Sequence, residues 1–264
     1  MSEVGTDKTG EQDQVGNTNT LSDALHRYRT SAAEKEREAS LLGLFGSGES
    51  VLDIGAKEGH YSRMLAQRYK RVVALDLERP DIPEVECVAG NACSLQFRDG
   101  EFDTVLAAEV LEHVPDVEAA AREIARVAAK RVVIGVPYKQ DIRIGRATCP
   151  GCGIIIQPWG HLHSFDEAKL SRLFAGMKVE KFEYIGTSSA STTALATWLM
   201  DRAGNPWGCA YRGVACTCGS FYTRPGTLTV PLRIAAKLAT IMNSVQASIK
   251  RPHPNWIHAL FTKR

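Results

Sequence analysis

A short apolar run that contains one acid and leads into two glycines four residues apart is the feature that most limits the fold of this chain. Residues 51–62 read VLDIGAKEGHYS, and RVVALD follows at 71–76. The pattern predicts a buried strand, a glycine turn, a helix and a second strand that ends in Asp76. Glycines let the backbone pass close to a ligand, and the first N–H groups of the helix have no partner within it. The unit therefore predicts a nucleoside site.

Two acids refine that prediction. Asp76 stands about 20 residues beyond the turn, where a carboxylate can accept two hydrogen bonds from a ribose diol. The dinucleotide fingerprint G-x-G-x-x-G is absent, and D-x-G-x-x-x-G stands in its place. Asp53, at the end of the first strand, can organise the turn and meet a cationic amino group. A nucleoside that carries an ammonium suits this pattern better than NAD does.

These residues resemble the class I S-adenosylmethionine methyltransferases, in particular the small-molecule group of methyltransferase type 11. The resemblance continues in AGNA at 89–92 and in EVLEHV at 109–114, and it covers roughly residues 40–186 and the last strand. The turn of that family commonly reads D-x-G-x-G-x-G, so Lys57 replaces its middle glycine. For Glu112, a solvated position on a helix is the alternative to a role in this segment.

The resemblance implies S-adenosyl-L-methionine as the cofactor, with an acid or amide near 91 beside the adenine amino group. It also implies an α/β, Rossmann-like fold, in which a seven-stranded, mostly parallel sheet carries helices on both faces. The residues of this chain that match the cofactor site of the family are Asp53, Gly55, Gly59, Asp76, Asn91, Ala92 and Glu109.

The alternation of strand and helix patterns agrees with such a sheet. We expect strands near 50–54, 71–76, 85–88, 102–107 and 131–136, and helices at 59–69 and 116–129. We also expect a helix that is capped by Asp166 and ends at about 176, followed by a strand at 178–185. In the family, that strand pairs in an antiparallel hairpin with a last strand, which we expect here at 256–261. Ligands of parallel sheets collect at the carboxyl ends of the strands.

Residues 1–19 are polar and predicted to be disordered, whereas 20–264 form a single methyltransferase domain with insertions at about 138–164 and 187–254. Within the second insertion, 231–250 has the apolar face of a helix. The formal net charge of +2 makes nucleic acid an unlikely partner. No apolar run is long enough to span a membrane, and the N-terminus lacks a secretory pattern, so we expect a cytoplasmic protein.

Cysteines gather in the two insertions, where Cys149 and Cys152 form a C-x-x-C-G knuckle and Cys216 and Cys218 form a C-x-C pair. Four thiolates can hold a structural zinc. Reduced, unpaired thiols and a redox pair remain alternatives, because C-x-C is the less common spacing.

Three histidines are candidate bases for transfer to a hydroxyl: His113 in EVLEHV, and His161 and His163 in GHLHSF at 160–165. The last segment is similar to a part of some bacterial methyltransferases that carry a C-x-x-C insertion. A base helps because the attacking oxygen must lose its proton. Packing of His113 under the sheet edge, and zinc ligation or loop capping by the other two, are the alternatives.

The sequence therefore predicts an S-adenosylmethionine-dependent O-methyltransferase with a small-molecule acceptor. A saccharide or glycolipid precursor is preferred, because aromatic side chains in and around the insertions can stack on sugar rings. Those side chains are Tyr138, Trp159, Trp198, Trp207 and Tyr211. An RNA methyltransferase with a zinc module and a non-catalytic nucleoside-binding scaffold are the rival functions, and a homodimer is kept as an option.

Overall fold

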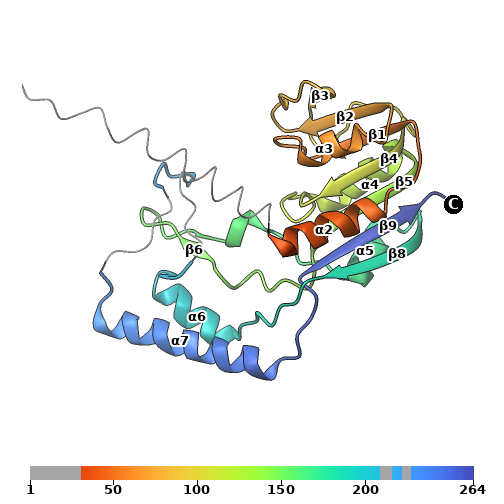
Figure 1. Ribbon diagram of the computed structural model, residues 1–264. Coiled ribbons are helices and arrows are strands. Elements are labelled where there is room, and N and C mark those ends of the chain that lie inside the picture. The colour runs from red at the N-terminus through yellow and green to blue at the C-terminus, as the bar shows by residue number, and fades with distance from the viewer. Residues whose placement is uncertain (1–30, 209–215, 222–226) are drawn as a thin grey trace, which may run out of the picture.

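The computed structural model describes residues 31–208, 216–221 and 227–264, and a seven-stranded sheet forms its centre (Figure 1). The strands are β1 (Ser50–Ile54), β2 (Arg71–Asp76), β3 (Glu86–Ala89), β4 (Phe102–Ala108), β5 (Ala128–Pro137), β8 (Lys178–Ile185) and β9 (Trp256–Thr262). Their order across the sheet is β3-β2-β1-β4-β5-β9-β8. The strands β1 to β5 pair in parallel, and β9 runs antiparallel to both β5 and β8. The predicted α/β fold is confirmed.

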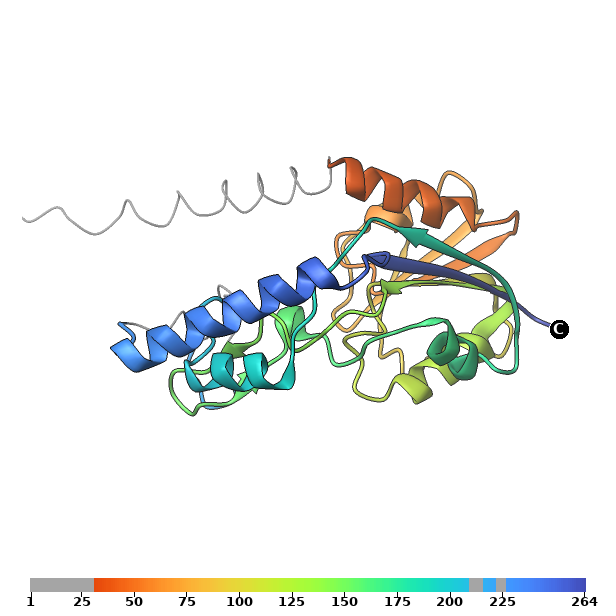
Figure 2. The same cartoon turned by 90° about the horizontal axis from the view of Figure 1, so that it is seen from below.

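Helices cover both faces of the sheet. One face carries α2 (Ala32–Gly43) and α3 (His60–Leu65), and the other carries α4 (Val117–Val127) and α5 (Glu167–Leu173). Figure 2 shows α2 on one side of the strands and α4 and α5 on the other. Side chains cap the first turns of three of these helices. Ser31 accepts a hydrogen bond from the Glu34 N–H of α2, and Asp116 accepts one from the Ala119 N–H of α4. Asp166 accepts one from the Lys169 N–H of α5.

Alternation along each strand divides the core into two layers. On β1, Val51 packs in the cluster beside α2 and α3, whereas Leu52 packs in the larger cluster beside α4 and α5. Both side chains are fully buried. Neighbouring residues of a strand point to opposite faces of the sheet. A strand covered on both faces therefore needs apolar residues at successive positions, without polar alternation.

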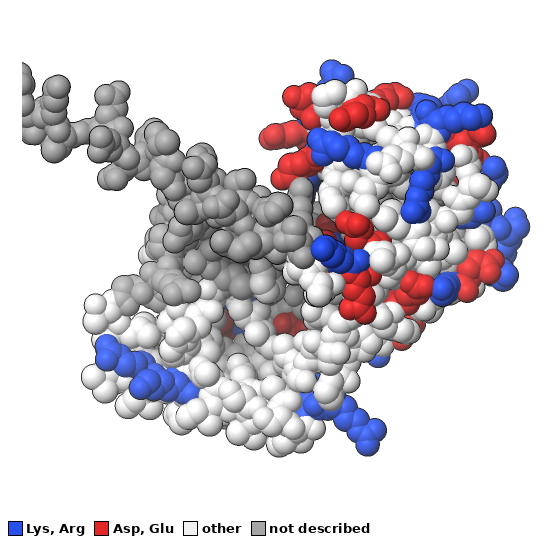
Figure 3. Space-filling view, viewed as in Figure 1, with Lys and Arg blue, Asp and Glu red and all other residues white. Residues whose placement is uncertain are grey.

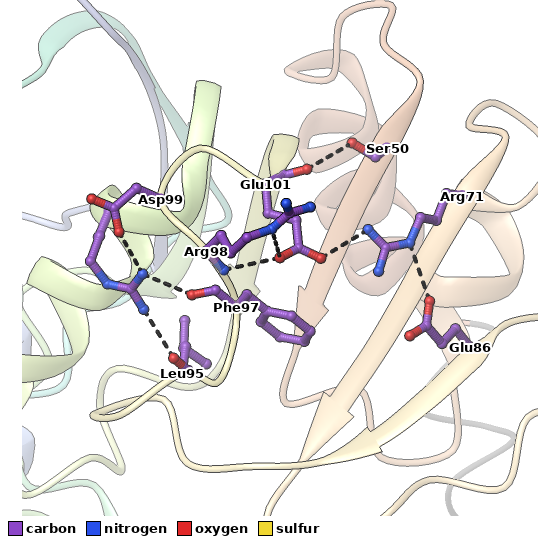
Figure 4. A network of polar contacts seen from close by, with 9 residues as sticks. Ser50, Arg71, Glu86, Leu95, Phe97, Arg98, Asp99 and Glu101 are labelled. Carbon is purple, nitrogen blue, oxygen red and sulfur yellow. Dashed lines mark hydrogen bonds and ion pairs between the residues drawn. The ribbon is translucent and has the colours of Figure 1, made fainter.

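A polar network fixes the amino ends of the strands, at the edge opposite the glycine turn (Figure 4). The Arg71 guanidinium contacts Glu86 at 3.2 Å and Glu101 at 3.1 Å. The Glu101 carboxylate also accepts a hydrogen bond from the Arg98 backbone N–H, and the backbone carbonyl of Glu101 accepts one from the Ser50 hydroxyl. These contacts connect the starts of β1, β2, β3 and β4 and leave the carboxyl ends for a ligand.

The two insertions pack together in a second lobe beside the sheet (Figure 1). The first contains β6 (Ala147–Thr148), β7 (Ile155–Ile156) and the 3₁₀ turn η1 (Pro158–Gly160), and the second contains α6 (Ala194–Arg202) and α7 (Val230–Ile249). The predicted helix at 231–250 is present as α7, whereas α6 was not predicted. The expected tail at 1–19 lies outside the described residues. Within the described ranges, no helix combines the length and the apolar composition needed to cross a bilayer.

Candidate functional site

The glycine turn follows β1 at the carboxyl edge of the sheet. Gly55 and Gly59 have φ of +77° and +78°, in the left-handed region that favours glycine. A Cβ atom on Gly55 would lie 2.4 Å from Val110, and one on Gly59 would lie 2.4 Å from Ile82. The turn is therefore wedged between two apolar side chains, and its position relative to the strand tips is fixed.

Asp53 lies in β1, two residues before the first glycine of the turn. Its side chain is 3% exposed, and its Oδ2 accepts a 2.5 Å hydrogen bond from the hydroxyl of Ser62 on α3. Burial raises the pKa of this carboxyl to about 7, although the Ser62 bond opposes the shift. Asp53 therefore connects the end of β1 to α3, and its role in organising the turn stays a prediction.

Asp76, at the tip of β2, is oriented by two backbone N–H groups. Its Oδ2 accepts from Lys57 at 3.0 Å, and its Oδ1 accepts from Leu77 at 2.7 Å. Lys57 adopts φ of +46°, so it takes the left-handed conformation even though glycine is absent. The Leu77 side chain is 75% exposed beside the acid. In such a pair, the carboxylate can bind a ribose, and the apolar side chain can contact the base attached to that ribose.

Asn91 and Ala92 follow β3. The Asn91 side chain is exposed, and its Oδ1 accepts the Cys93 N–H at 2.9 Å in a local turn. The Ala92 side chain is buried in the larger core cluster. Ala92 can therefore offer only its backbone to a ligand, while Asn91 can offer its amide.

Glu109 follows β4 and is paired to α2. It adopts φ of +58°, and Arg37 donates to its carboxylate. Burial raises the pKa of Glu109, and the charge of Arg37 opposes that shift. The same guanidinium lies 3.3 Å from Glu34 and 4.3 Å from the ring centroid of Trp256. The pair holds α2 against the tips of β4 and β9.

A side-chain hydrogen bond ties α2 to the glycine turn. His60, the first residue of α3, has its Nε2 2.7 Å from Oε2 of Glu38. Since α2 is thus attached both beside Glu109 and beside the turn, it borders the region where the tips of β1 and β4 converge.

The structure corrects the interpretation of Glu112. Its side chain is fully buried, and neither carboxylate oxygen has a hydrogen-bond partner on another described residue. Burial raises the pKa of this acid to about 8, and the nearby charge of Glu109 adds to the rise. The solvated-helix interpretation was wrong, because the segment after β4 is a turn that directs Glu112 inward.

The candidate histidines have different surroundings. His113 is exposed, and burial of part of its ring together with the charge of Lys57 lowers its pKa. His161 is buried, its Nδ1 lies 2.6 Å from the Gln140 amide oxygen, and burial lowers its pKa to about 4. The rings of His113 and His161 meet edge to face, 4.7 Å apart. Both imidazoles are therefore neutral near pH 7.

His163 is separate from this pair. Its Nε2 lies 2.9 Å from the carbonyl oxygen of Val114 and so donates to it. The neighbouring Leu162 N–H donates to the Glu112 carbonyl at 2.6 Å. These bonds attach the first insertion to the segment after β4, as the loop-capping alternative for His163 expected. Of the three candidates, His113 and His161 are brought together with Glu112: ligand atoms of the three lie within 4.8 Å of one another.

The four cysteines of the two insertions also converge. Their Sγ atoms all lie within 4.8 Å of one another, with 3.6 Å between Cys149 and Cys218 and 3.5 Å between Cys152 and Cys216. Cys149 and Cys216 are buried, and the other two are exposed. The Ser220 carbonyl accepts the Cys216 N–H at 2.7 Å, which closes the second loop around the sulfurs.

The aromatic residues do not form one cluster. Tyr138 is buried at the end of β5, where its hydroxyl donates to Glu167, whereas Trp159, Trp198 and Trp207 are each more than half exposed. Tyr211 lies outside the described residues.

Several contributors to the site were not predicted. They are Ser62, which holds Asp53; Leu77, beside Asp76; Arg37, which pairs with Glu109; and Gln140, which holds His161. An acid followed by leucine at a strand tip is a signal that could have indicated Leu77. The others depend on contacts between distant segments and leave no local pattern.

Comparison with known proteins agrees with this geometry. Residues 52–134 match the family model described as a methyltransferase domain. A probable tocopherol O-methyltransferase of Oryza sativa subsp. japonica is 32% identical over 127 residues, which are 43% of this chain and 30% of that protein. A probable S-adenosylmethionine-dependent methyltransferase of Mycolicibacterium smegmatis is 28% identical over 143 residues, 51% of this chain and 54% of the relative. The chain thus matches only a third to a half of the length of these relatives.

Solved structures share the fold at low sequence identity. A methyltransferase of Archaeoglobus fulgidus, described as dependent on S-adenosylmethionine, has a TM-score of 0.53 at 12% identity, covering 92% of this chain and 99% of its own. The 1,6-didemethyltoxoflavin-N1-methyltransferase of Burkholderia thailandensis, solved with S-adenosylhomocysteine, has a TM-score of 0.52 at 15% identity, covering 93% and 84%. Residues 52–134 therefore carry a methyltransferase domain, and the chain has the fold of the class I S-adenosylmethionine-dependent methyltransferases.

Proposed function

We propose that the chain transfers a methyl group from S-adenosylmethionine to a hydroxyl of a small molecule. The observation that carries the proposal is the convergence of Asp53, Asp76 and Glu109 on one edge of the sheet, beside a neutral histidine. S-adenosylmethionine supplies a methyl group on a positively charged sulfur. Relatives whose names denote O-methylation, such as a ubiquinone biosynthesis O-methyltransferase that is 34% identical over 94 residues, support the choice of oxygen.

The donor set at this edge of the sheet fits the cofactor. Asp76 offers a carboxylate that two backbone N–H groups orient, and Leu77 offers an exposed apolar surface for a purine. Glu109 places negative charge where an ammonium or sulfonium needs a counterion. We propose that the backbone of Gly55 and Gly59 approaches the ligand and that Asn91 binds the base.

We propose His113 as the general base. Its lowered pKa leaves it neutral near pH 7, and a hydrogen bond with the Gly160 backbone orients the ring. A neutral imidazole with one protonated nitrogen has an acceptor on the other. The acceptor hydroxyl can give its proton to that nitrogen as its oxygen attacks the methyl group. His161, packed against His113 and held by Gln140, is a positioning residue.

The test is methyl transfer from tritiated S-adenosylmethionine across pools of phenols, sugars, lipids and RNA. Incorporation into one small-molecule pool supports the proposal, and incorporation into RNA alone would establish the rival RNA methyltransferase. His113→Ala should lower kcat by about 10²–10⁴-fold and leave cofactor binding intact. It should also remove the acidic limb of the kcat profile. Glu118→Ala, an exposed change on α4, is the matched control, and equal turnover in both variants would exclude His113.

The acceptor class also belongs to this proposal. The saccharide preference is supported only by exposed Trp159, Trp198 and Trp207, and their rings can stack on apolar rings of other kinds equally well. The sugar and phenol arms of the screen separate these options.

We further propose that the four cysteines bind one structural zinc. A tetrahedron with Zn–S bonds of about 2.3 Å has sulfurs about 3.8 Å apart, close to the separations found here. A disulfide needs about 2.05 Å, so the four cysteines are not joined by disulfides in this arrangement. Since Cys149 and Cys152 come from the first insertion and Cys216 and Cys218 from the second, the metal would clamp the two insertions together.

Metal analysis of protein purified without chelators tests the zinc. We expect about one zinc per chain, lost in Cys149→Ser and retained in Cys93→Ser, a half-buried cysteine outside the cluster. Removing the metal should lower the melting temperature of the wild type and of Cys93→Ser, but not that of Cys149→Ser. A metal-free protein with unchanged melting, or mass spectra showing disulfides among the four cysteines, would contradict the proposal.

A further inference from the structure

The outer face of α7 is built from large apolar side chains. Its buried face is made of small residues, since Ala236 and Ala239 are fully buried in the packing of α7 within the lobe. The opposite face exposes six large residues, each 49–78% accessible. They are Val230, Ile234, Leu238, Ile241, Val245 and Ile249, spaced three or four residues apart, and together they form the apolar stripe. The spacing places them in one row along the helix.

This arrangement is the inverse of an ordinary surface helix, which buries its large apolar residues and exposes polar ones. Part of the stripe borders a pocket of about 530 Å³ whose lining includes Ile241, Val245 and Ile249. Extended apolar patches on a protein surface mark sites of interaction. The stripe therefore needs a partner that accepts aliphatic side chains.

Charge indicates what that partner is. Residues 202–264 contain nine Lys and Arg residues and no Asp or Glu, although the whole chain carries only +2. Of these cations, Arg233 and Lys237 lie on α7 and are exposed, and Lys250 and Arg251 follow its last turn. Figure 3 shows acidic side chains concentrated on the sheet lobe, whereas the lobe of α7 is mainly uncharged with basic groups near both ends.

A second copy of the chain fits this surface poorly. An antiparallel pair of α7 helices would place Arg233 and Lys237 of one copy beside Lys250 and Arg251 of the other, with no acid on either helix to compensate. Like charges in such pairs repel. An anionic bilayer surface satisfies both features, because it accepts the aliphatic row between its headgroups and attracts the cations.

We propose that α7 is an interfacial helix that docks the protein on anionic lipid surfaces. The helix lies in the plane of the membrane, with the apolar stripe inserted at the level of the headgroups. Under the proposed function, docking would direct the enzyme to acceptors carried in or released from a bilayer. The docking itself does not depend on methyl transfer, so the two can fail separately.

Sedimentation of the full chain with vesicles tests the proposal. We expect binding to vesicles of mixed phosphatidylcholine and phosphatidylglycerol, weaker binding at high salt, and little binding to phosphatidylcholine alone. Ile241→Glu with Val245→Glu should lower binding at least tenfold. Arg233→Glu with Lys237→Glu should lower it about tenfold or more. The matched control for the Ile241/Val245 variant is Gln67→Glu with Ala129→Glu, two exposed changes on the sheet domain that add the same two negative charges and should leave binding as in the wild type.

The contrary outcomes are distinct. Absence of binding to anionic vesicles overturns the proposal, as does equal binding by the Ile241/Val245 variant when circular dichroism shows that it is folded. A dimer by light scattering that this variant abolishes, without vesicle binding, would assign the stripe to a second copy. The protein could instead bind RNA in a salt-sensitive way and fail to bind vesicles. If the Ile241/Val245 variant left that RNA binding unchanged, the cations would be assigned to nucleic acid. Transfer to a soluble acceptor, with no effect of vesicles, would leave the methyltransferase proposal intact.

Discussion

Glu112 shows at the scale of one residue how environment overrides sequence pattern. An acid in a segment rich in charge and near a helix is usually solvated, yet this side chain is fully buried and without a partner on another described residue. Burial of an unpaired charge is costly, so the acid keeps its proton to a higher pH. Asp53 follows the same rule with a pKa of about 7. Both acids therefore keep their protons to a higher pH than an exposed carboxyl does.

Glu112→Gln tests this account through pH. The pKa of Glu112 rises from 4.5 to about 8 on folding, so the folded state holds a proton that the unfolded state loses. The wild type should lose stability as pH rises through this window, whereas the glutamine does not titrate. The free energy of unfolding of Glu112→Gln relative to wild type should therefore rise between pH 4.5 and 8, by a few kcal/mol. Urea titrations at several pH values measure it, and a constant difference would contradict the burial.

At the scale of elements, α2 joins the cofactor edge to the closing hairpin of the sheet. Its Arg37 is buried between Glu34, Glu109 and Trp256, so one side chain connects three segments. Its Glu38 reaches His60 at the start of α3. A helix held at both of these points is fixed in place beside the glycine turn.

Removing the guanidinium should destabilise the protein strongly. Arg37→Met leaves the buried Glu34 and the half-buried Glu109 without their cation, and breaking a buried pair such as Arg37 and Glu34 by removing one partner costs about 3–5 kcal/mol. Arg63→Met is the matched control, since it removes an exposed ion pair with Glu84 and should change stability by less than about 1 kcal/mol. The free energies of unfolding in urea compare them. Equal losses in the two variants would show that α2 is not anchored by this pair.

The elements differed in how well the sequence predicted them. The strands of the sheet were predicted to within a few residues, because β1, β2 and β5 are continuous apolar runs bounded by turn residues. The predicted helix at 59–69 ends already at Leu65, since the last residues of that pattern form a turn. α6 escaped prediction because its exposed face carries Leu195 and Trp198, so it lacks a clear polar side.

For the whole molecule, motif spacing along the chain was sufficient to predict that Asp53, Asp76 and Glu109 meet at one edge of the sheet, but not how the second lobe packs. Asp53, Asp76 and Glu109 lie at strand ends, and parallel topology alone brings such ends together. The convergence of Cys149 with Cys218 depends on how two insertions far apart in the chain pack. The total charge of +2 also concealed the basic C-terminal region, because acids before residue 202 compensate it.

The most direct test of the central claim is calorimetric titration of the protein with S-adenosylmethionine and with its demethylated product. We predict one site per chain for each, with Asp76→Ala weakening both by about tenfold or more through loss of hydrogen bonds to the ribose. The exposed variant Glu118→Ala should bind as the wild type does. Absence of binding, affinity that Asp76→Ala leaves unchanged, or preferential binding of NAD would contradict the assignment of this edge to S-adenosylmethionine.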